Sequence, residues 1–331
     1  MLEHGGGLRV AAERYGIPLS DWLDLSTGIN PQGWPVPPIP ATVWQRLPET
    51  NDGLEAAAAA YYGAESLLPV AGSQAAIQAL PLVREPGRIG VLSPSYAEHA
   101  HAWRRAGHQV ELLPAASLDA AIAQLDALVL AHPNNPTGVR FPLESLLDWR
   151  ARLAARGGWL VVDEAFMDAT PEGSLANHVG LPGLIVLRSL GKFFGLAGAR
   201  VGFVLADPTV LDCLREHLGP WTVTGPSRWV ATRALSDCAW QAAMRADLDR
   251  AGSRLAELLK RQGLPAVGGT GLFQWAPAPD AVFWQDALAR RGILVRRFTD
   301  PPALRFGLPG GEPAWRRLEL ALAGVRTERL R

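Results

Sequence analysis

Lysine is almost absent from this sequence. Of its 331 residues, 32 are lysine or arginine, and the only lysines among them are Lys192 and Lys260. Nearly all of the positive charge is therefore carried by arginine. A lysine retained in such a composition indicates a specific role rather than a generic surface charge.

Cysteines, long apolar runs and an excess of charge of one sign are also lacking. The two cysteines, Cys213 and Cys238, exclude a disulfide framework and form no CxxC pair, so no metal is expected. No apolar stretch approaches the ~20 residues of a membrane-spanning helix. The 32 acidic residues balance the 32 basic ones, which argues against nucleic acid or an anionic membrane as a partner. The N-terminal MLEHGGGLRV lacks the pattern of a signal peptide, and we expect a cytoplasmic protein that binds small molecules.

Short apolar runs alternate with segments of helical period along most of the chain. This alternation predicts an α/β fold with a mainly parallel central sheet covered by helices, and a smaller C-terminal α/β lobe. The runs expected as strands of the central sheet are residues 89–92, 110–113, 128–131, 160–162, 184–187 and 201–205. We expect an N-terminal segment at 1–40 that packs on the active site and on the small lobe, a large domain at 41–232 and a small domain at 233–331.

Two helical predictions concern segments close to the expected site. Residues 226–262 are predicted to form one long helix, and Gly72-Ser73-Gln74 is predicted to begin another, with Ser73 capping its free backbone N–H groups. A helix N-terminus preceded by glycine can hold a phosphate. Capping without any ligand is the commoner meaning of such a turn, and both readings stay open at this point.

Polar residues follow four of the expected strands. Tyr96 closes the segment after one strand, Asn135 lies in HPNNPTG (132–138) after another, Asp163 ends a third, and Ser189 to Lys192 follow a fourth. Because ligands of such folds gather at the carboxyl ends of the strands, these side chains are expected to meet. Each also has a simpler reading, since Asp163 could cap a helix, Tyr96 could belong to the core and Asn135 could shape a turn.

The segment SLGKFFGLAGARVG (189–202) places Lys192 beside groups suited to an anion. Ser189 lies three residues before the lysine and Arg200 eight after it, and the glycines let the backbone approach a ligand closely. An amine can condense with an aldehyde, while a hydroxyl and a guanidinium can hold a phosphate. A glycine-rich turn with an incidental lysine is the alternative. The arrangement resembles the lysine signature of pyridoxal-phosphate enzymes of the aspartate-aminotransferase fold, fold type I.

The chain offers a group for each part of pyridoxal 5′-phosphate. Lys192 supplies an amine for the aldehyde, Asp163 a carboxylate for the protonated pyridine nitrogen, Tyr96 a flat face and Asn135 a donor for the phenolic oxygen. Glu164 is expected to point to the other face of its strand. The residues expected around the phosphate are Gly72, Ser73, Gln74, Ser189 and Arg200.

Further motifs narrow the resemblance, which covers nearly the whole chain. HGG (4–6), STGINP (26–31), PNNPTG (133–138), VDEAF (162–166), LRSLGKFFGLAGARVGF (187–203), PWTV (220–223) and GILVR (292–296) together are similar to the threonine-phosphate decarboxylase family of cobalamin biosynthesis. Histidinol-phosphate aminotransferases share many of these segments. The resemblance implies a homodimer that decarboxylates L-threonine O-3-phosphate to (R)-1-amino-2-propanol phosphate.

The resemblance also implies a role for individual residues. Lys192 would bind the cofactor covalently and Asp163 would pair with its ring nitrogen, which makes these two the expected catalytic residues. Arg305 would bind the substrate α-carboxylate and Arg296 its phosphate, although two solvated arginines are the alternative on composition alone. The remaining substrate contacts implied are His4, Gly5, Gly28 and Asn135, the last of which would also contact the cofactor.

Three positions depart from the pattern of related aminotransferases. Phe166 replaces a tyrosine that hydrogen-bonds the cofactor, and this change favours the decarboxylase slightly. Leu47 replaces a tyrosine that reaches the cofactor phosphate of the neighbouring subunit, and Gly28 stands where relatives often have asparagine.

Two other functions remain as alternatives. One is an aminotransferase acting on histidinol phosphate, which would need a 2-oxo acid as co-substrate. The other is a non-catalytic effector module of the kind found fused to DNA-binding domains. The complete Lys192, Asp163, Asn135 and Arg200 set argues against the second.

Overall fold

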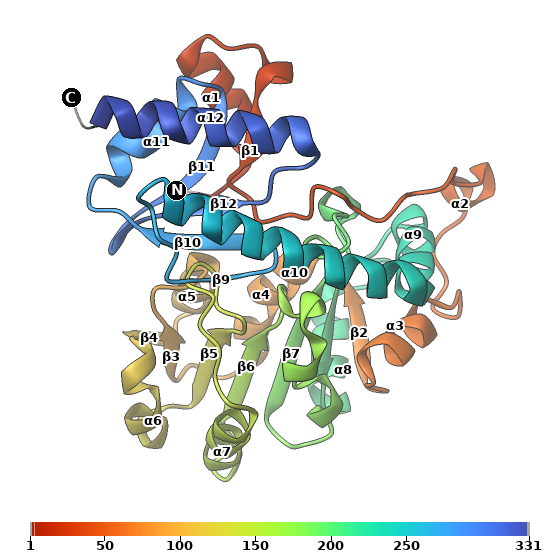
Figure 1. Ribbon diagram of the computed structural model, residues 1–331. Helices are drawn as coiled ribbons and strands as arrows, with labels where there is room; N and C mark the ends of the chain where they lie inside the picture. Colours follow the sequence, from red (N-terminus) through yellow and green to blue (C-terminus); the bar gives the residue numbers. More distant parts are fainter. Residues whose placement is uncertain (1, 3, 330–331) are drawn as a thin grey trace. The chain divides into compact units, whose positions relative to one another are not determined.

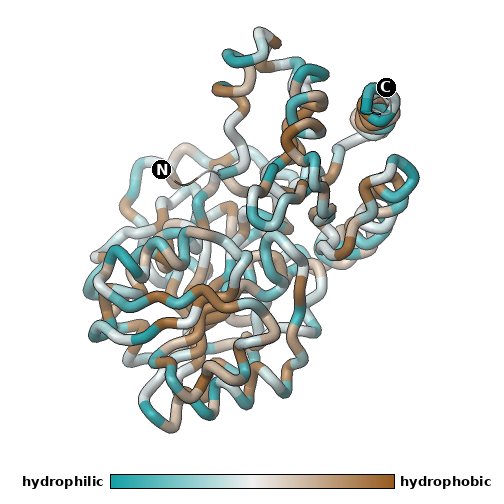
Figure 2. Tube along the Cα trace, turned by 90° about the vertical axis from the view of Figure 1, so that its left-hand side faces the viewer, coloured by the Kyte–Doolittle hydropathy of each residue, from teal (hydrophilic) through white to brown (hydrophobic). Residues whose placement is uncertain are grey.

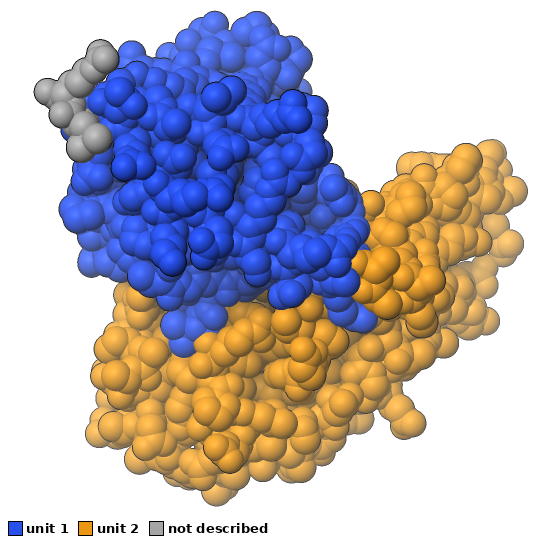
Figure 3. All heavy atoms as spheres, viewed as in Figure 1, with its two compact units in different colours: residues 1–32, 136–139, 244–331 blue, residues 33–135, 140–243 orange. Residues whose placement is uncertain are grey.

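The computed structural model describes Leu2 and residues 4–329 of the chain. The chain divides into two compact units, which are coloured separately in Figure 3. Unit 1 comprises residues 1–32, 136–139 and 244–331, and unit 2 comprises residues 33–135 and 140–243. The terminal residues 1, 3, 330 and 331 of the predicted domains lie outside the described residues. The three-part division predicted from sequence stays a prediction.

Unit 2 is built on a seven-stranded sheet of order β2-β8-β7-β6-β5-β3-β4. Neighbours among β3 to β7 run parallel, whereas β8 is antiparallel to both β7 and β2. The strands are β2 (Leu67–Val70), β3 (Arg88–Leu92), β4 (Gln109–Leu113), β5 (Ala127–Ala131), β6 (Trp159–Asp163), β7 (Leu184–Ser189) and β8 (Gly202–Ala206). The mainly parallel sheet and its six predicted strands are thus confirmed.

Helices enclose the sheet of unit 2, as Figure 1 shows. They are α3 (Leu54–Tyr62), α4 (Ser73–Ala79), α5 (Ala97–Arg105), α6 (Leu118–Ala121), α7 (Leu143–Ala154), α8 (Pro208–Leu218) and α9 (Gly225–Ser236). The short helix α2 (Ala41–Gln45) buries none of its residues and lies away from the sheet. One continuous core joins the sheet to α4, α5 and α8. The most hydrophobic stretches of this unit gather at its centre in Figure 2, because a sheet covered by helices needs apolar side chains on both faces.

The helix before the site begins differently from the prediction. Gly72 holds the N-cap position of α4 with φ 75°, and no side chain caps this helix. The prediction that Ser73 caps the helix is therefore wrong, since Ser73 is already the first helical residue. Glycine is suited to this position because a positive φ is costly for other residues.

The predicted single helix over 226–262 is also wrong. The structure contains α9 and a separate helix, α10 (Cys238–Arg261), which meet at Asp237. Asp237 Oδ1 accepts a hydrogen bond from the Trp240 amide at 3.0 Å. The Gln241 side chain satisfies the carbonyls of Ala234 and Leu235 at the end of α9. These bonds occupy the backbone groups that a helix break frees.

Unit 1 contains a five-stranded sheet of order β1-β11-β12-β10-β9. Only β1 and β11 pair in parallel, and the other neighbours are antiparallel. Its elements are α1 (Leu8–Tyr15), β1 (Leu23–Leu25), β9 (Gly268–Thr270), β10 (Phe273–Pro277), α11 (Ala281–Ala289), β11 (Ile293–Thr299), β12 (Pro302–Gly307) and α12 (Glu312–Arg329), together with most of α10. The predicted mixed α/β character of the C-terminal lobe is confirmed. Among the residues that the structure covers, no helix combines the length and apolarity needed to span a membrane.

Candidate active site

The carboxyl ends of β3, β5, β6 and β7 bring the predicted cofactor-binding side chains of unit 2 together. They surround a cavity of about 150 Å³. The lining residues are Ser73, Gln74, Tyr96, Ala131, Asn135, Asp163, Ala165, Phe166, Ser189, Gly191, Lys192, Ala197 and Arg200. All of the predicted cofactor-binding residues line this cavity except Gly72, which adjoins it next to Ser73.

Asp163 ends β6 and is buried. Its Oδ2 lies 2.9 Å from Nε2 of the buried His99, and its Oδ1 accepts a hydrogen bond from the Ala165 amide at 3.0 Å. These two contacts fix the plane of the carboxylate. His99 was not among the predicted residues; it lies in the first turn of α5, and Tyr96 is the N-cap residue of that helix.

Glu164, the neighbour of Asp163, points away from this cavity as predicted. It is fully buried and accepts hydrogen bonds from the Arg188 guanidinium, from Ser174 Oγ and from the Leu175 amide. Burial raises the pKa of this carboxyl, and the charge of Arg188 opposes that effect. The two carboxylates therefore have separate environments, and only Asp163 faces the cavity.

Lys192 extends into the cavity from the turn that follows β7. Its Nζ lies 5.3 Å from the centre of the Phe166 ring. Phe166 is buried and contributes an apolar wall. Ser189, at the end of β7, is also buried, and its Oγ accepts a hydrogen bond from the Gly191 amide at 3.2 Å.

Gly72, Ser73 and Arg200 form a close cradle at one end of the cavity. A Cβ atom on Gly72 would lie 2.7 Å from Arg200 Nη2, and one on Gly202 would lie 2.5 Å from the Ser73 nitrogen. Arg200 itself has φ 52°, a left-handed conformation that arginine seldom adopts. The glycines are therefore required by space, and they leave hydroxyl, amide and guanidinium donors in one place.

Tyr96 is fixed by a hydrogen bond from its hydroxyl to Gln74 Oε1 at 3.1 Å. Burial, together with the carboxylates of Glu98 and Asp163, raises the pKa of the Tyr96 phenol to about 12. Tyr96 therefore stays neutral at physiological pH. Its ring also contacts His99 edge-on at 6.0 Å, which places the ring beside the partner of Asp163.

Asn135 lies next to a buried asparagine that organises its loop. Asn134 accepts a hydrogen bond from Ser95 Oγ at 2.7 Å and donates one to the Pro94 carbonyl at 2.8 Å. These bonds join the loop after β5 to the loop after β3. Asn134 thus shapes the turn, whereas Asn135 faces the cavity.

The donor set of this cavity fits pyridoxal 5′-phosphate. It provides an amine for the aldehyde, a fixed carboxylate for a protonated nitrogen, an aromatic face, and the cradle of donors for a phosphate.

The predicted substrate arginines lie in unit 1, opposite each other on β11 and β12. Arg296 pairs with Arg305 in the antiparallel register, so the two side chains share one face of the sheet. Arg305 is buried, and burial together with the charge of Arg296 lowers its pKa to about 10. Both arginines lie within their strands, as a cross-strand pair. Two cations held this close favour an anion between or beside them.

Ser26 connects the N-terminal segment of unit 1 to Arg305. Its hydroxyl donates to Asp24 Oδ1 at 2.6 Å and accepts a hydrogen bond from the Gly6 amide at 2.8 Å, while its carbonyl accepts one from Arg305 Nη2 at 2.5 Å. A Cβ on Gly5 would lie 2.3 Å from that carbonyl oxygen. The predicted residue Gly5 therefore packs directly behind the partner of Arg305.

The other two predicted substrate residues also belong to unit 1. His4 is exposed. Gly28 has φ 63°, and its amide nitrogen lies 3.5 Å from the position that a Cβ on Gly307 would take. Gly28 therefore lies close to Gly307, the last residue of β12.

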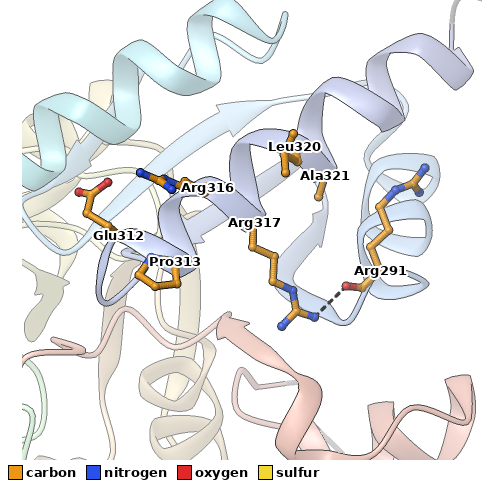
Figure 4. A pocket seen from close by; sticks show the side chains of 7 residues that line it. All are labelled: Arg291, Glu312, Pro313, Arg316, Arg317, Leu320 and Ala321. Atoms are coloured by element: carbon orange, nitrogen blue, oxygen red, sulfur yellow. Dashed lines mark hydrogen bonds between the residues drawn. The ribbon is translucent and has the colours of Figure 1, made fainter.

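A wider groove of about 720 Å³ lies elsewhere in unit 1, along α12 (Figure 4). Arg291, Arg316 and Arg317 line it, and Arg317 Nη2 donates to the Arg291 carbonyl at 2.9 Å. None of the predicted site residues is among its described lining residues. We therefore locate the site by its chemistry, at the smaller cavity around Lys192.

His132, between β5 and Asn135, makes stability sensitive to acid. Burial, and secondly the charge of Arg140, lower the pKa of His132 to about 4 from 6.5. Between these pH values the unfolded chain binds a proton that the folded chain excludes, so stability falls as the pH falls. At about 1.4 kcal/mol per pKa unit, the loss in the free energy of unfolding approaches about 3 kcal/mol.

We expect His132→Gln to flatten the acid limb, which is the decrease in the free energy of unfolding between pH 7 and pH 4, as measured by urea unfolding. The exposed His217→Gln should leave this decrease unchanged. An unchanged limb in His132→Gln would contradict this assignment.

Comparisons with known proteins cover nearly the whole chain. Residues 44–330 match the family model described as aminotransferase class I and II. A threonine-phosphate decarboxylase of Pseudomonas aeruginosa is 59% identical over 98% of this chain and 98% of its own length. A histidinol-phosphate aminotransferase of Shewanella amazonensis is 36% identical over 77% of this chain and 76% of its own.

Solved structures agree on the fold. The crystal structure of histidinol-phosphate aminotransferase from Sinorhizobium meliloti in complex with pyridoxal-5′-phosphate has a TM-score of 0.84. The match covers 98% of this chain and 95% of that chain at 21% identity. An identity this low establishes the shared architecture alone.

Proposed function

The chain belongs to the aminotransferase class I and II family, and from this premise we propose that it is a pyridoxal-phosphate-dependent threonine-phosphate decarboxylase. The reaction converts L-threonine O-3-phosphate to (R)-1-amino-2-propanol phosphate and carbon dioxide. The product serves as the linker of the cobalamin nucleotide loop.

One observation supports the decarboxylase assignment most strongly. The decarboxylase from Pseudomonas aeruginosa is similar over practically all of both chains at 59% identity, whereas the aminotransferase from Shewanella amazonensis reaches 36% over about three quarters. The apolar Phe166 beside Lys192 supports the same choice. Histidinol-phosphate aminotransferase activity is the second candidate, because the cavity could serve either reaction.

When bound, pyridoxal phosphate supplies an aldehyde that takes an amine and a protonated ring that accepts an electron pair. The side chains of unit 2 determine how it is held. Lys192 would supply the amine that holds the cofactor and the proton that the substrate Cα takes up after carbon dioxide leaves. Asp163, fixed by His99 and the Ala165 amide, holds the proton on the ring nitrogen. The cradle of Ser73 and Arg200 binds the phosphate.

The two arginines of unit 1 orient the substrate. Arg296 binds the substrate phosphate and Arg305 contacts the α-carboxylate, each through a bidentate guanidinium. Holding both anions fixes rotation about the bonds to Cα. The bond that breaks is the one aligned with the electron-accepting system, so this grip selects loss of carbon dioxide over loss of the Cα proton.

The test is to measure product formation with and without a 2-oxo acid. Purified protein with pyridoxal phosphate should release carbon dioxide from L-threonine O-3-phosphate at the same rate whether or not 2-oxoglutarate is present. Turnover of histidinol phosphate that requires 2-oxoglutarate, with no carbon dioxide released from threonine phosphate, would assign the aminotransferase instead.

The arginine pair predicts binding of inorganic phosphate to the cofactor-loaded protein, in which the cofactor already fills the cradle of Ser73 and Arg200. An anion relieves the repulsion between Arg296 and Arg305, so saturating phosphate should raise the Tm of the loaded protein by about 1–2 °C for each kcal/mol of binding free energy. Arg296→Ala should remove most of this rise in a thermal shift assay. Arg297→Ala is the matched control, since adjacent strand residues point to opposite faces. An equal rise in Arg296→Ala and the wild type would refute the phosphate assignment.

We further propose that the protein is a homodimer, as the resemblance implies. Helix α2 buries none of its residues, and the segment around it exposes Trp44 and Leu47, each by 65%. A groove of about 410 Å³ beside this segment is lined in part by Leu47 and Trp229. Exposed apolar surface of this kind is typical of a protein interface.

A negative charge introduced on α2 should therefore weaken the proposed homodimer. We expect the wild type to sediment at twice the mass of one chain and Trp44→Glu to shift toward the monomer with lower activity. Val267→Glu, at another exposed apolar residue, is the control. A wild-type protein that is monomeric and fully active would contradict this proposal.

A further inference from the structure

Lys192 begins a tight turn whose outer side is covered by aromatic residues. The Gly195 amide donates to the Lys192 carbonyl at 3.2 Å, and the Leu196 amide donates to the Leu190 carbonyl at 3.2 Å. Phe193 and Phe194, at the centre of the turn, are completely buried. The position of the Lys192 backbone therefore depends on what packs against these two rings.

Gly33 and Trp34 press on the turn through the backbone. The Trp34 amide donates to the Phe194 carbonyl at 2.8 Å. A Cβ on Gly33 would lie 3.0 Å from that carbonyl oxygen and 3.2 Å from Gly195 Cα. The proline-rich segment 31–40 thus touches the lysine turn so closely that a side chain at position 33 would have to push the turn by a few tenths of an ångström.

Asp237 and Trp240 complete the contact from the junction of α9 and α10. The Trp34 indole N–H donates to Asp237 Oδ2 at 3.0 Å. Hydrogen bonds from the Trp240 amide and the Trp34 indole hold the pKa of Asp237 below its usual value. The Trp240 ring stacks on Phe194 with centroids 5.6 Å apart and meets Phe193 edge-on at 5.4 Å.

The same residues adjoin both main connections of the chain between the two units. Unit 2 starts at Gly33, directly before Trp34, and α10 passes from unit 2 to unit 1 after residue 243, three residues after Trp240. The residues next to these two connections are therefore fastened, within unit 2, to the turn that carries Lys192.

We propose that Trp34, Asp237 and Trp240 form a clamp of positioning residues that sets the place of Lys192. None of the three lines the cavity around Lys192, so they act through the turn. This proposal rests on the proposed role of Lys192. It assigns to Gly33 and Trp34, in the proline-rich segment, the function of positioning the turn. A displacement of about 1 Å at a reacting group can cost about 100-fold in rate, which makes such a clamp consequential.

The direct test is Gly33→Ala, which pushes on the turn from outside. Hydrogen exchange of the Gly195 and Leu196 amides, measured without substrate, should accelerate by about 10-fold or more if the turn loosens. The pH midpoint of the visible absorption band of the cofactor-loaded protein should shift, because the Lys192 nitrogen has moved. We expect kcat to fall by roughly 10- to 100-fold, with a much smaller change in KM for L-threonine O-3-phosphate.

Two further variants distinguish a displacement of the Lys192 turn from a general loss of stability. Gly180→Ala is the matched control, since Gly180 is exposed and has open space around its Cβ position. Trp34→Phe keeps an aromatic ring and the backbone bond but removes the indole N–H, and it should show a weaker form of the same changes. If Gly33→Ala folds with unchanged exchange at Gly195 and an unchanged midpoint, or lowers only Tm, the clamp is refuted. Both readouts are independent of the substrate, so they hold even if the decarboxylase assignment fails.

Discussion

Replacing Lys192 with alanine is expected to lower kcat for L-threonine O-3-phosphate by at least about 10³-fold. Lys192 is the only lysine lining the cavity, and it acts both as the amine that binds the cofactor and as the proton donor to Cα. The Phe166 ring, whose centre lies 5.3 Å from the Lys192 ammonium, is apolar and offers no group to replace it. The measurement is carbon dioxide release with saturating pyridoxal phosphate.

The sequence itself supplies the control for this variant. Lys260, near the end of α10, is the only other lysine of the chain, and Lys260→Ala should retain wild-type turnover. Borohydride should attach the cofactor irreversibly to the wild type and to Lys260→Ala, but not to Lys192→Ala. Wild-type turnover in Lys192→Ala would overturn the account of the site.

Asp163→Asn is the second change with a large expected effect. Asparagine has the same size and can keep the bond from the Ala165 amide, but it has no charge to hold a proton on the ring nitrogen. We expect kcat to fall by about 10²- to 10³-fold, the range found when one charge-stabilising group is removed from an active site. The assay is single-turnover decarboxylation with cofactor content measured in the same sample.

The control for Asp163→Asn is Asp212→Asn on α8, where an exposed carboxylate pairs with Arg215. This variant should behave as the wild type. An Asp163→Asn protein that retains cofactor and full kcat would show that the carboxylate has no catalytic role. Loss of cofactor alone, with normal kcat in the loaded fraction, would limit Asp163 to binding.

Much of the fold follows from local patterns in the sequence. The alanine-rich segment 54–62 is helix α3, because alanine favours helix and Gly63 at φ 67° ends it. Strand β2 was missed because Pro69 lies within it, and a proline lowers strand propensity. It is tolerated because β2 is an edge strand, where one side of the backbone needs no partner.

The errors arose where a tertiary contact decides between two local readings. Residues 226–262 have helical character throughout, yet Asp237 breaks the helix because its side chain caps α10 and bonds Trp34 from a distant segment. At the start of α4, a residue preceding Ser73 had to take a positive φ to bring the backbone beside Arg200. Sequence position alone does not reveal either requirement.

The site was easier to predict than its supports. Lys192, Asp163, Tyr96 and Asn135 follow strands, so the topology of a parallel sheet brings them to one edge. His99 lies inside a helix and was missed, because its function depends on which way that helix faces. The opposition of Arg296 and Arg305 depends on a strand register that neither segment shows by itself.

The central claim is best tested with L-threonine O-3-phosphate labelled with ¹³C in its carboxyl group. Purified protein with pyridoxal phosphate and no 2-oxo acid should release labelled carbon dioxide and unlabelled aminopropanol phosphate in equal amounts over many turnovers. Product that retains the label, or turnover only after a 2-oxo acid is added, would contradict the decarboxylase and identify an aminotransferase.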